Sequence, residues 1–211
     1  TDRCSSSEWK LSSSDFILVN KAWRYKKEIT FGTISSFDVK TLMPSNWQND
    51  NVVNAFLSLV STQSSLTLNV RVHTFSTYLF TVLCAKSWNS SVLRASLSVN
   101  PTDFDILFFP IHFTKHWQLI ACYPNSSLLV YFDSLLTVNF TVLGLTLGFL
   151  EALFSSNNVN FVLKEWMLLA PETIPHQEDS SSCGVFACMN AYLLACGKTN
   201  SFYQSEDIED I

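Results

Sequence analysis

Hydrophobic positions along the chain recur with two spacings, one typical of helices and the other typical of strands. Val52, Phe56 and Val60 lie four residues apart, so they share one face of a predicted helix whose N-cap is Asn46 or Asn49. We predict three further helices, 78–85, 142–154 and 183–196, and Gly197 closes the last of them.

Short apolar runs bounded by Pro, Asn and Ser predict strands. The runs 117–123 and 128–132 flank the turn-forming residues 124–127, so we expect these two strands to form a hairpin. Residues 171–182 are polar and predict a loop. The other predicted strands are 16–19, 28–34, 69–75, 105–111 and 161–163. Strands and helices that alternate in this way favour an α+β fold with a central mixed sheet flanked by helices.

The pattern contains no internal repeat and no linker, so we predict one folded domain. Its 211 residues fit that prediction, since most single domains are about 100–200 residues long. Residues 1–15 are rich in Ser and predict a loose lead-in, residues 16–204 form the domain, and residues 205–211 form an acidic tail.

The low charge of the chain narrows its partners. Only 15% of residues are charged, and the net charge is −5, which disfavours a nucleic-acid partner. The stretches 116–132 and 134–150 carry no charge. Both are shorter than the roughly 20 apolar residues of a membrane span, and both contain polar residues, so we expect no membrane partner.

The cysteines and histidines give no sign of a metal site. None of the six cysteines forms a C-x-x-C pair, and their irregular spacing suggests reduced thiols in an intracellular protein. His112 and His116 have the spacing of zinc ligands on a helix, but their surroundings favour strands. We therefore predict neither a metal nor a cofactor. The chain also opens without the features of a secretory signal.

A single carboxylate stands out in the apolar middle of the chain. Asp133 is the only charged residue between Lys115 and Glu151, and it follows a predicted strand. His116 opens the other strand of the predicted hairpin, so the two side chains should meet at one edge of the sheet. A carboxylate in that position orients an imidazole and stabilises its protonated form. The alternative is a carboxylate that caps the next turn.

Cys183 is the best candidate for a nucleophile among the cysteines. It opens a predicted helix, whose backbone N–H groups and dipole favour a thiolate. Gly184 would let a substrate carbonyl approach the backbone, and Gln177 on the preceding loop can donate a hydrogen bond to an oxyanion. With His116 and Asp133, these residues form a set of nucleophile, base and orienting group.

The segments around these residues resemble the SUMO proteases, which are the sentrin-specific, or ubiquitin-like-protein-specific, cysteine proteases. Residues 110–117 and 131–134 resemble the His and Asp blocks of that family, and residues 174–188 resemble its Gln and Cys block. Residues 42–53 resemble its Trp-Leu-Asn-Asp motif. Two departures are Gln48, where the family usually has Leu, and Ser182, where it usually has Asp.

The resemblance implies a papain-like-clan cysteine protease fold, with the nucleophile at the N-terminus of a helix. It assigns Cys183 as the nucleophile, His116 as general base and acid, and Asp133 as the residue that orients His116. Gln177 would help to form the oxyanion hole.

The resemblance also implies substrate-binding residues. Trp47 and Trp117 would enclose the Gly-Gly tail of the substrate in a narrow slot, with Asp50 and Gly184 beside it. From the sequence alone, both Trp residues would be assigned to the core. Because the chain carries so few charges, we also expect an exposed apolar patch around the two Trp side chains.

The function implied is an isopeptidase that cleaves after the C-terminal Gly-Gly of SUMO or a related ubiquitin-like protein. Such an enzyme deconjugates the modifier or matures its precursor, needs no cofactor, and acts as a monomer in the nucleus or cytoplasm. Three alternatives stay open: a deubiquitinase or an acyltransferase of the same clan, and a non-catalytic module that binds ubiquitin-like proteins.

Overall fold

The computed structural model describes residues 34–43 and 45–198 of the chain. The predicted lead-in 1–15, the strand 16–19, most of the strand 28–34 and the acidic tail 205–211 lie outside the described residues.

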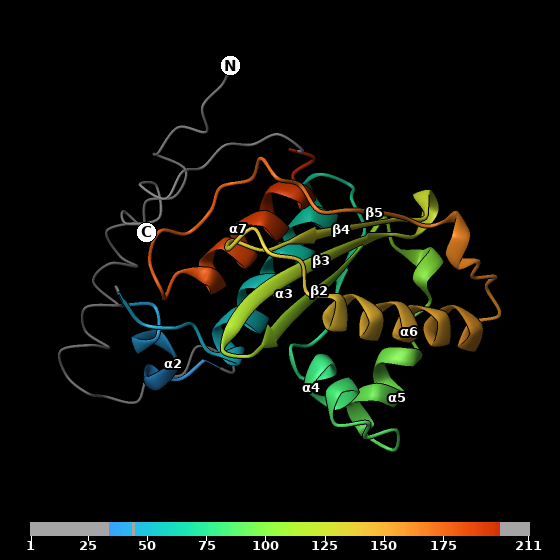
Figure 1. Ribbon diagram of the computed structural model, residues 1–211, viewed down its shortest axis with the longest axis horizontal. Coiled ribbons are helices and arrows are strands. Elements are labelled where there is room, and N and C mark those ends of the chain that lie inside the picture. Colours follow the sequence, from blue (N-terminus) through green and yellow to red (C-terminus); the bar gives the residue numbers. More distant parts are fainter. Residues whose placement is uncertain (1–33, 44, 199–211) are drawn as a thin grey trace.

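The centre of the structure is a five-stranded sheet with the order β1-β2-β3-β4-β5 (Figure 1). The outer pairs β1–β2 and β4–β5 are parallel, whereas β2, β3 and β4 are antiparallel, so the sheet is mixed as predicted. The predicted hairpin is confirmed as β3–β4. The strands are β1 (Val72–Thr74), β2 (Ile106–Phe113), β3 (His116–Tyr123), β4 (Leu128–Phe132) and β5 (Met167–Leu169).

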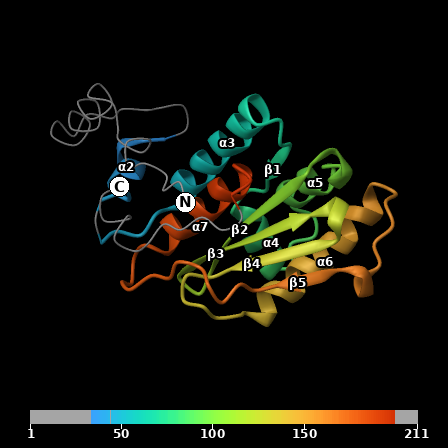
Figure 2. The same ribbon diagram turned by 90° about the horizontal axis from the view of Figure 1, so that it is seen from above.

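Helices cover both faces of this sheet, which confirms the α+β architecture. Residues of α3 and α7 pack against one face, and residues of α4, α5 and α6 pack against the other. Figure 1 shows these last three helices below the sheet, and Figure 2 shows α3 beside α7. The α-helices are α2 (Ser36–Lys40), α3 (Asp50–Thr67), α4 (Tyr78–Cys84), α5 (Ser91–Leu97), α6 (Phe140–Ser156) and α7 (Cys183–Ala195). Short 3₁₀ turns are η2 (Pro101–Asp103), η3 (Pro124–Ser126) and η4 (Leu163–Glu165). Within the described residues, no helix is both long enough and apolar enough to span a bilayer.

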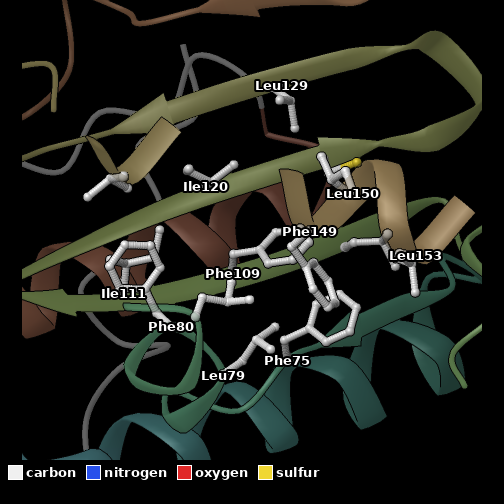
Figure 3. Close-up of a cluster of buried hydrophobic side chains, with 14 of the residues drawn as sticks. Phe75, Leu79, Phe80, Phe109, Ile111, Ile120, Leu129, Phe149, Leu150 and Leu153 are labelled. Carbon is white, nitrogen blue, oxygen red and sulfur yellow. The ribbon is translucent and has the colours of Figure 1, made fainter. Parts of the chain in front are cut away.

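Alternate residues of the strands supply two separate cores. In β3, Leu119 and Ala121 pack toward α3 and α7, whereas Ile120 and Cys122 pack toward α6, as the two-residue repeat of a strand requires. In the core between the sheet and α6, an aromatic cluster joins β2 to the end of β1 and to α6 (Figure 3). In this cluster, Phe109 stacks on Phe75 at 4.6 Å between ring centroids and meets Phe149 edge-on at 5.9 Å.

The predicted strand 161–163 is wrong. Residues 161 and 162 are irregular and lead into η4, and the strand forms later, as β5. The ring of Phe161 packs against Phe154 and Trp166, at 5.5 and 5.1 Å between centroids, so its apolar character serves the contact with α6. The sequence pattern also missed two short helices, α2 and α5, which are defined mainly by the caps of Ser35 and Ser90.

A buried carboxylate fixes the segment that precedes α3. Asp38 of α2 accepts hydrogen bonds from the backbone and hydroxyl of Ser35, and from the side-chain amides of Asn49 and Asn51. The hydrogen bond from the Ser35 hydroxyl has the largest effect on the pKa of Asp38. With the other hydrogen bonds it outweighs burial and holds this pKa well below its usual range. Asn49 also caps α3, as one of the two predicted residues. Asp38 thus ties α2 to the start of α3.

Candidate functional site

The β2–β3–β4 meander brings His116 to Asp133, as the sequence predicts. The two-residue turn before His116 holds Thr114 and Lys115 at positive φ angles of 50° and 64°, a conformation typical of tight hairpins but strained for Thr. In the next hairpin, Leu119 pairs with Phe132, so the start of β3 lies beside the end of β4. The Nε2 atom of His116 lies 2.6 Å from Oδ1 of Asp133.

Asp133 is buried, and four donors compensate for the loss of water around its carboxylate. Oδ1 meets His116 and accepts the backbone N–H of Leu135, while Oδ2 accepts the Thr137 hydroxyl at 2.6 Å and the Gln118 amide at 3.4 Å. Burial raises the pKa of Asp133, but the hydrogen bonds from His116 and Thr137 outweigh it and lower the pKa overall. The contact with Leu135 also fits the turn-capping alternative, so Asp133 both caps its turn and holds His116.

His116 connects this carboxylate to Cys183. Burial lowers the pKa of His116, but hydrogen bonds and charges of Asp133 and Cys183 raise it to about 9 overall. The raised pKa favours the protonated form of His116. Because Nε2 faces Asp133, Nδ1 is the nitrogen that can meet the thiol. Cys183 itself is buried and is the first residue of α7, which confirms its predicted place at a helix N-terminus.

Gln177 is held firmly beside the same site. Its Oε1 accepts the Ser134 hydroxyl at 2.7 Å, its backbone N–H donates to the Ser134 carbonyl, and its Nε2 donates to the Asp179 carbonyl at 2.8 Å. The amide carries two N–H groups, and only one of them bonds to another described residue. The second can donate to a further acceptor.

The two predicted tryptophans differ in their environments. Trp117 is 2% exposed, donates its indole N–H to the Gln48 carbonyl, and stacks on His112 at 4.6 Å. It lies in the core, as the sequence alone suggests. Trp47 is 46% exposed and donates to the Ser180 carbonyl at 2.8 Å. Trp47 therefore bridges the segment before α3 and the loop before α7. Its exposure contradicts the core assignment that the sequence alone suggests for it, and the apolar patch around the two Trp side chains stays a prediction.

Gly184 is required by packing within the protein. A Cβ atom at this position would lie 2.7 Å from Oε1 of Gln48 and 3.1 Å from Cδ1 of Trp117. The side chains of Gln48 and Trp117 therefore occupy the space beside the Gly184 backbone. The close approach of a substrate carbonyl to Gly184 stays a prediction. Asp50 opens α3 with a partly exposed side chain, and its carboxylate makes no hydrogen bond or ion pair with any described residue. Its role in substrate binding also stays a prediction.

The structure adds site residues that sequence reasoning missed. Gln118, Ser134 and Thr137 contact Asp133 or Gln177 directly. They are ordinary polar residues in a chain rich in Ser and Thr, so no pattern marks them. His112 and His116 lie on adjacent strands rather than on one helix, and the described residues contain no group of three His, Cys, Asp or Glu that could hold a metal.

Gln48 gives a stability prediction. Its Oε1 is buried without a hydrogen-bond partner, and its Nε2 makes only long contacts with the carbonyls of Thr41 and Asn46, at 3.4 and 3.3 Å. A buried unpaired polar atom costs about 1–3 kcal/mol, so we expect Gln48→Leu to raise the free energy of unfolding by about 1 kcal/mol. Urea unfolding of the two proteins measures this difference in the free energy of unfolding.

Gln118→Leu is the matched control for Gln48→Leu. The Oε1 of Gln118 is also buried and unpaired, but its Nε2 donates to Asp133, so this change also removes a hydrogen bond and should raise the free energy of unfolding less than Gln48→Leu does. A lower urea midpoint for Gln48→Leu than for the unmodified chain would contradict this prediction. It would show that the hydrogen bonds of Gln48 stabilise the fold more than their lengths indicate.

Comparison with known proteins places this arrangement in a family. Residues 46–211 match the model of the Ulp1 protease family, C-terminal catalytic domain. A sentrin-specific protease of Caenorhabditis elegans is 29% identical over 153 residues, which are 72% of this chain and 22% of that protein. Sentrin-specific protease 2 of Homo sapiens is 28% identical over 185 residues, 86% of this chain and 30% of that protein. The chain thus spans less than a third of the length of these curated relatives.

Solved structures share the fold. The C-terminal Ulp1 protease domain in complex with Smt3, the yeast orthologue of SUMO, has a TM-score of 0.77 at 21% identity and covers 94% of this chain and 90% of its own. The catalytic domain of an Ulp1-like SUMO protease from Chaetomium thermophilum has a TM-score of 0.76 at 21% identity, covering 94% and 85%. With the family match over more than half of its residues, the chain belongs to the Ulp1 protease family.

Proposed function

We propose that this protein is a cysteine protease that cleaves after the C-terminal Gly-Gly of SUMO or a related ubiquitin-like protein. The observation that carries the proposal is the contact of Cys183 and Asp133 with opposite sides of His116, at the N-terminus of α7. The names of the curated relatives and the complex of a solved relative with Smt3 support SUMO as the substrate.

In this proposal, His116 first takes the proton of the Cys183 thiol, which gives a thiolate–imidazolium pair. The Sγ atom of Cys183 attacks the carbonyl carbon of the second Gly, and the carbonyl oxygen becomes an oxyanion. The free N–H of the Gln177 amide and the backbone N–H of Cys183 stabilise that charge. When the C–N bond breaks, His116 gives its proton to the leaving amine, and a thioester remains on Cys183.

The second half of the reaction uses His116 as a base. Neutral His116 takes one proton from water, and the resulting hydroxide attacks the thioester carbonyl. The C–S bond breaks, Cys183 returns as a thiolate, and the carboxylic acid of the released modifier gives the second proton of the water to solvent. Asp133 stays ionised throughout and stabilises each protonated state of His116.

Substrate selection is proposed to depend on the space around Trp47 and Trp117. Two flat indoles would leave a slot that only residues without side chains can pass, which suits Gly-Gly. Asp50 and Gly184 would border this slot. We further propose that the protein acts as a monomer in the nucleus or cytoplasm without nucleic acid or membrane, in keeping with the net charge of −5.

The decisive experiment labels the protein with C-terminal propargylamide probes of SUMO, ubiquitin and other ubiquitin-like proteins, with Cys183→Ala as the control. Labelling by the SUMO probe, lost in Cys183→Ala, supports the proposal. Labelling by ubiquitin alone would make the protein a deubiquitinase, and labelling by no probe would favour a binding module. Acyl transfer from acetyl-CoA would indicate the acyltransferase.

The pKa of His116 predicts the alkaline limit of the reaction. Because the leaving amine needs a proton from His116, and the pKa of His116 is raised to about 9, kcat/KM for an isopeptide substrate should fall as the pH rises through about 9. A pH–rate profile with a SUMO–lysine conjugate measures this. A descending limb near the ordinary His value of about 6.5 would contradict the thiolate–imidazolium pair.

A further inference from the structure

The loop between Gln177 and Cys183 is organised around one side chain. Oδ1 of Asp179 accepts the backbone N–H groups of Ser181 and Ser182, at 3.1 and 3.0 Å, and the Ser182 hydroxyl at 2.7 Å. Its Oδ2 lies 3.4 Å from the Ser181 hydroxyl. A single carboxylate therefore holds the two residues that come directly before the nucleophile.

The main chain of Asp179 holds the other side of the site. Its carbonyl accepts Nε2 of Gln177 at 2.8 Å. The next carbonyl, that of Ser180, accepts the indole N–H of Trp47 at 2.8 Å. Asp179 thus holds the start of α7 through its side chain and the amide of Gln177 through its backbone carbonyl.

These contacts leave the N-terminus of α7 uncapped. Ser182 is the N-cap residue, and a Ser at this position normally accepts a backbone N–H of the helix through its hydroxyl oxygen. Here the Ser182 side chain makes no such bond, and its Oγ is held 2.7 Å from Oδ1 of Asp179, to which the hydroxyl donates. The backbone N–H of Cys183 and the first N–H groups of α7 can then face a substrate oxyanion.

The ionisation of Asp179 agrees with this geometry. Burial raises the pKa of Asp179, but the hydrogen bonds from Ser182 and Ser181 outweigh it and lower the pKa overall. Its neighbour Glu178 is exposed and makes no hydrogen bond or ion pair with a described residue.

We propose that Asp179 is a positioning residue, which holds Gln177 and the N-terminus of α7 in the geometry that an oxyanion requires and keeps Ser182 from capping the helix. This inference rests on the proposed protease function and adds to it a residue outside the Cys183–His116–Asp133 set. Asp179 acts as a hydrogen-bond acceptor here, so an amide oxygen in its place can do the same work.

The test compares Asp179→Ala, Asp179→Asn and the control Glu178→Ala, with a SUMO–lysine conjugate as substrate. Small displacements in an active site cost up to about 100-fold in rate, so we expect kcat to fall about ten-fold or more in Asp179→Ala, with KM changed less than about two-fold. Asp179→Asn should keep at least about half of kcat, because its amide oxygen accepts the same N–H groups. Glu178→Ala, which removes the same charge from the same loop, should keep the unmodified kcat.

A second readout works without any substrate. Hydrogen exchange of the Ser181 and Ser182 amides should be faster in Asp179→Ala than in the unmodified chain, and unchanged in Asp179→Asn and Glu178→Ala. If the unmodified chain cleaves no ubiquitin-like conjugate, the proposed function fails, and the exchange rates still decide whether Asp179 holds the loop. Unchanged exchange or unchanged kcat in Asp179→Ala would overturn the proposal. So would a loss in Asp179→Asn as large as that in Asp179→Ala, since charge would then be the decisive property.

Discussion

Replacement of Asp133 by Asn should lower kcat/KM for a SUMO–lysine conjugate by about 10³–10⁴-fold, the loss typical when the orienting carboxylate of such a set is made neutral. The amide oxygen of the new side chain could still accept the backbone N–H of Leu135, so the turn should survive. A neutral amide could not stabilise the charge of an imidazolium 2.6 Å away. Steady-state kinetics of the purified variant measure the change.

The pH profile separates this cause from a general loss of structure. Without the charge of Asp133, the pKa of His116 should fall from about 9 toward its ordinary value of 6.5, and the alkaline limb of the profile should move with it. Glu151→Gln is the matched control, because it removes an exposed carboxylate from α6 and should leave rate and profile unchanged. An Asp133→Asn variant with unmodified kcat/KM would show that His116 works without this partner.

The same pair contributes to stability in a defined pH window. Because folding raises the pKa of His116, its contribution is complete below the unfolded value of about 6.5 and is lost as the pH rises through about 9. Because folding lowers the pKa of Asp133, its contribution is present above the ordinary value of 3.8 and is lost in acid. The unmodified chain should therefore exceed Asp133→Asn in stability most clearly between these limits.

Phe109→Ala should lower the free energy of unfolding by about 3–5 kcal/mol, the usual cost of emptying a buried aromatic site. Phe109 is 4% exposed and lies between Phe75 and Phe149, so its ring joins β2 to the end of β1 and to α6 (Figure 3). Truncation would leave a cavity between elements that cannot move together without disturbing the sheet. Urea unfolding followed by circular dichroism measures the loss.

Phe140→Ala is the control for Phe109→Ala. Phe140 opens α6 with 80% of its surface exposed, and exposed substitutions usually change stability by less than about 0.5 kcal/mol. Equal losses in the two variants, or a loss of less than about 1 kcal/mol in Phe109→Ala, would mean that the aromatic cluster can collapse around the missing ring.

Sequence reasoning was most successful where contacts are local. The meeting of His116 and Asp133 followed from two alternating strands and a short turn, because a hairpin fixes which ends lie side by side. Cys183 could be recognised as the start of a helix, but nothing in that pattern says that the helix packs beside His116, some 70 residues earlier. The family resemblance predicted that Cys183 lies beside His116, and the structure shows that contact.

Long-range packing explains what could not be predicted. β5 is short, all three of its residues are exposed, and it pairs in parallel with a strand made much earlier, so no local pattern marks it. The burial of Trp117 and the exposure of Trp47 also depend on distant partners, namely Gln48 and Ser180. Thr137 could not be predicted, because what distinguishes it is its hydrogen bond to Asp133, which the sequence pattern does not show.

The position of Cys183, the proposed nucleophile, on α7 has a consequence for synthesis of the protein on the ribosome. The growing chain acquires His116 and Asp133 well before Cys183, and the sheet face that α7 covers stays open until that helix emerges. If Cys183 is the nucleophile as proposed, an incomplete chain cannot cleave a substrate, because Cys183 is made together with the helix that completes this core. A nascent chain stalled before residue 183 would expose Phe108 and Leu119, and would engage chaperones rather than substrates.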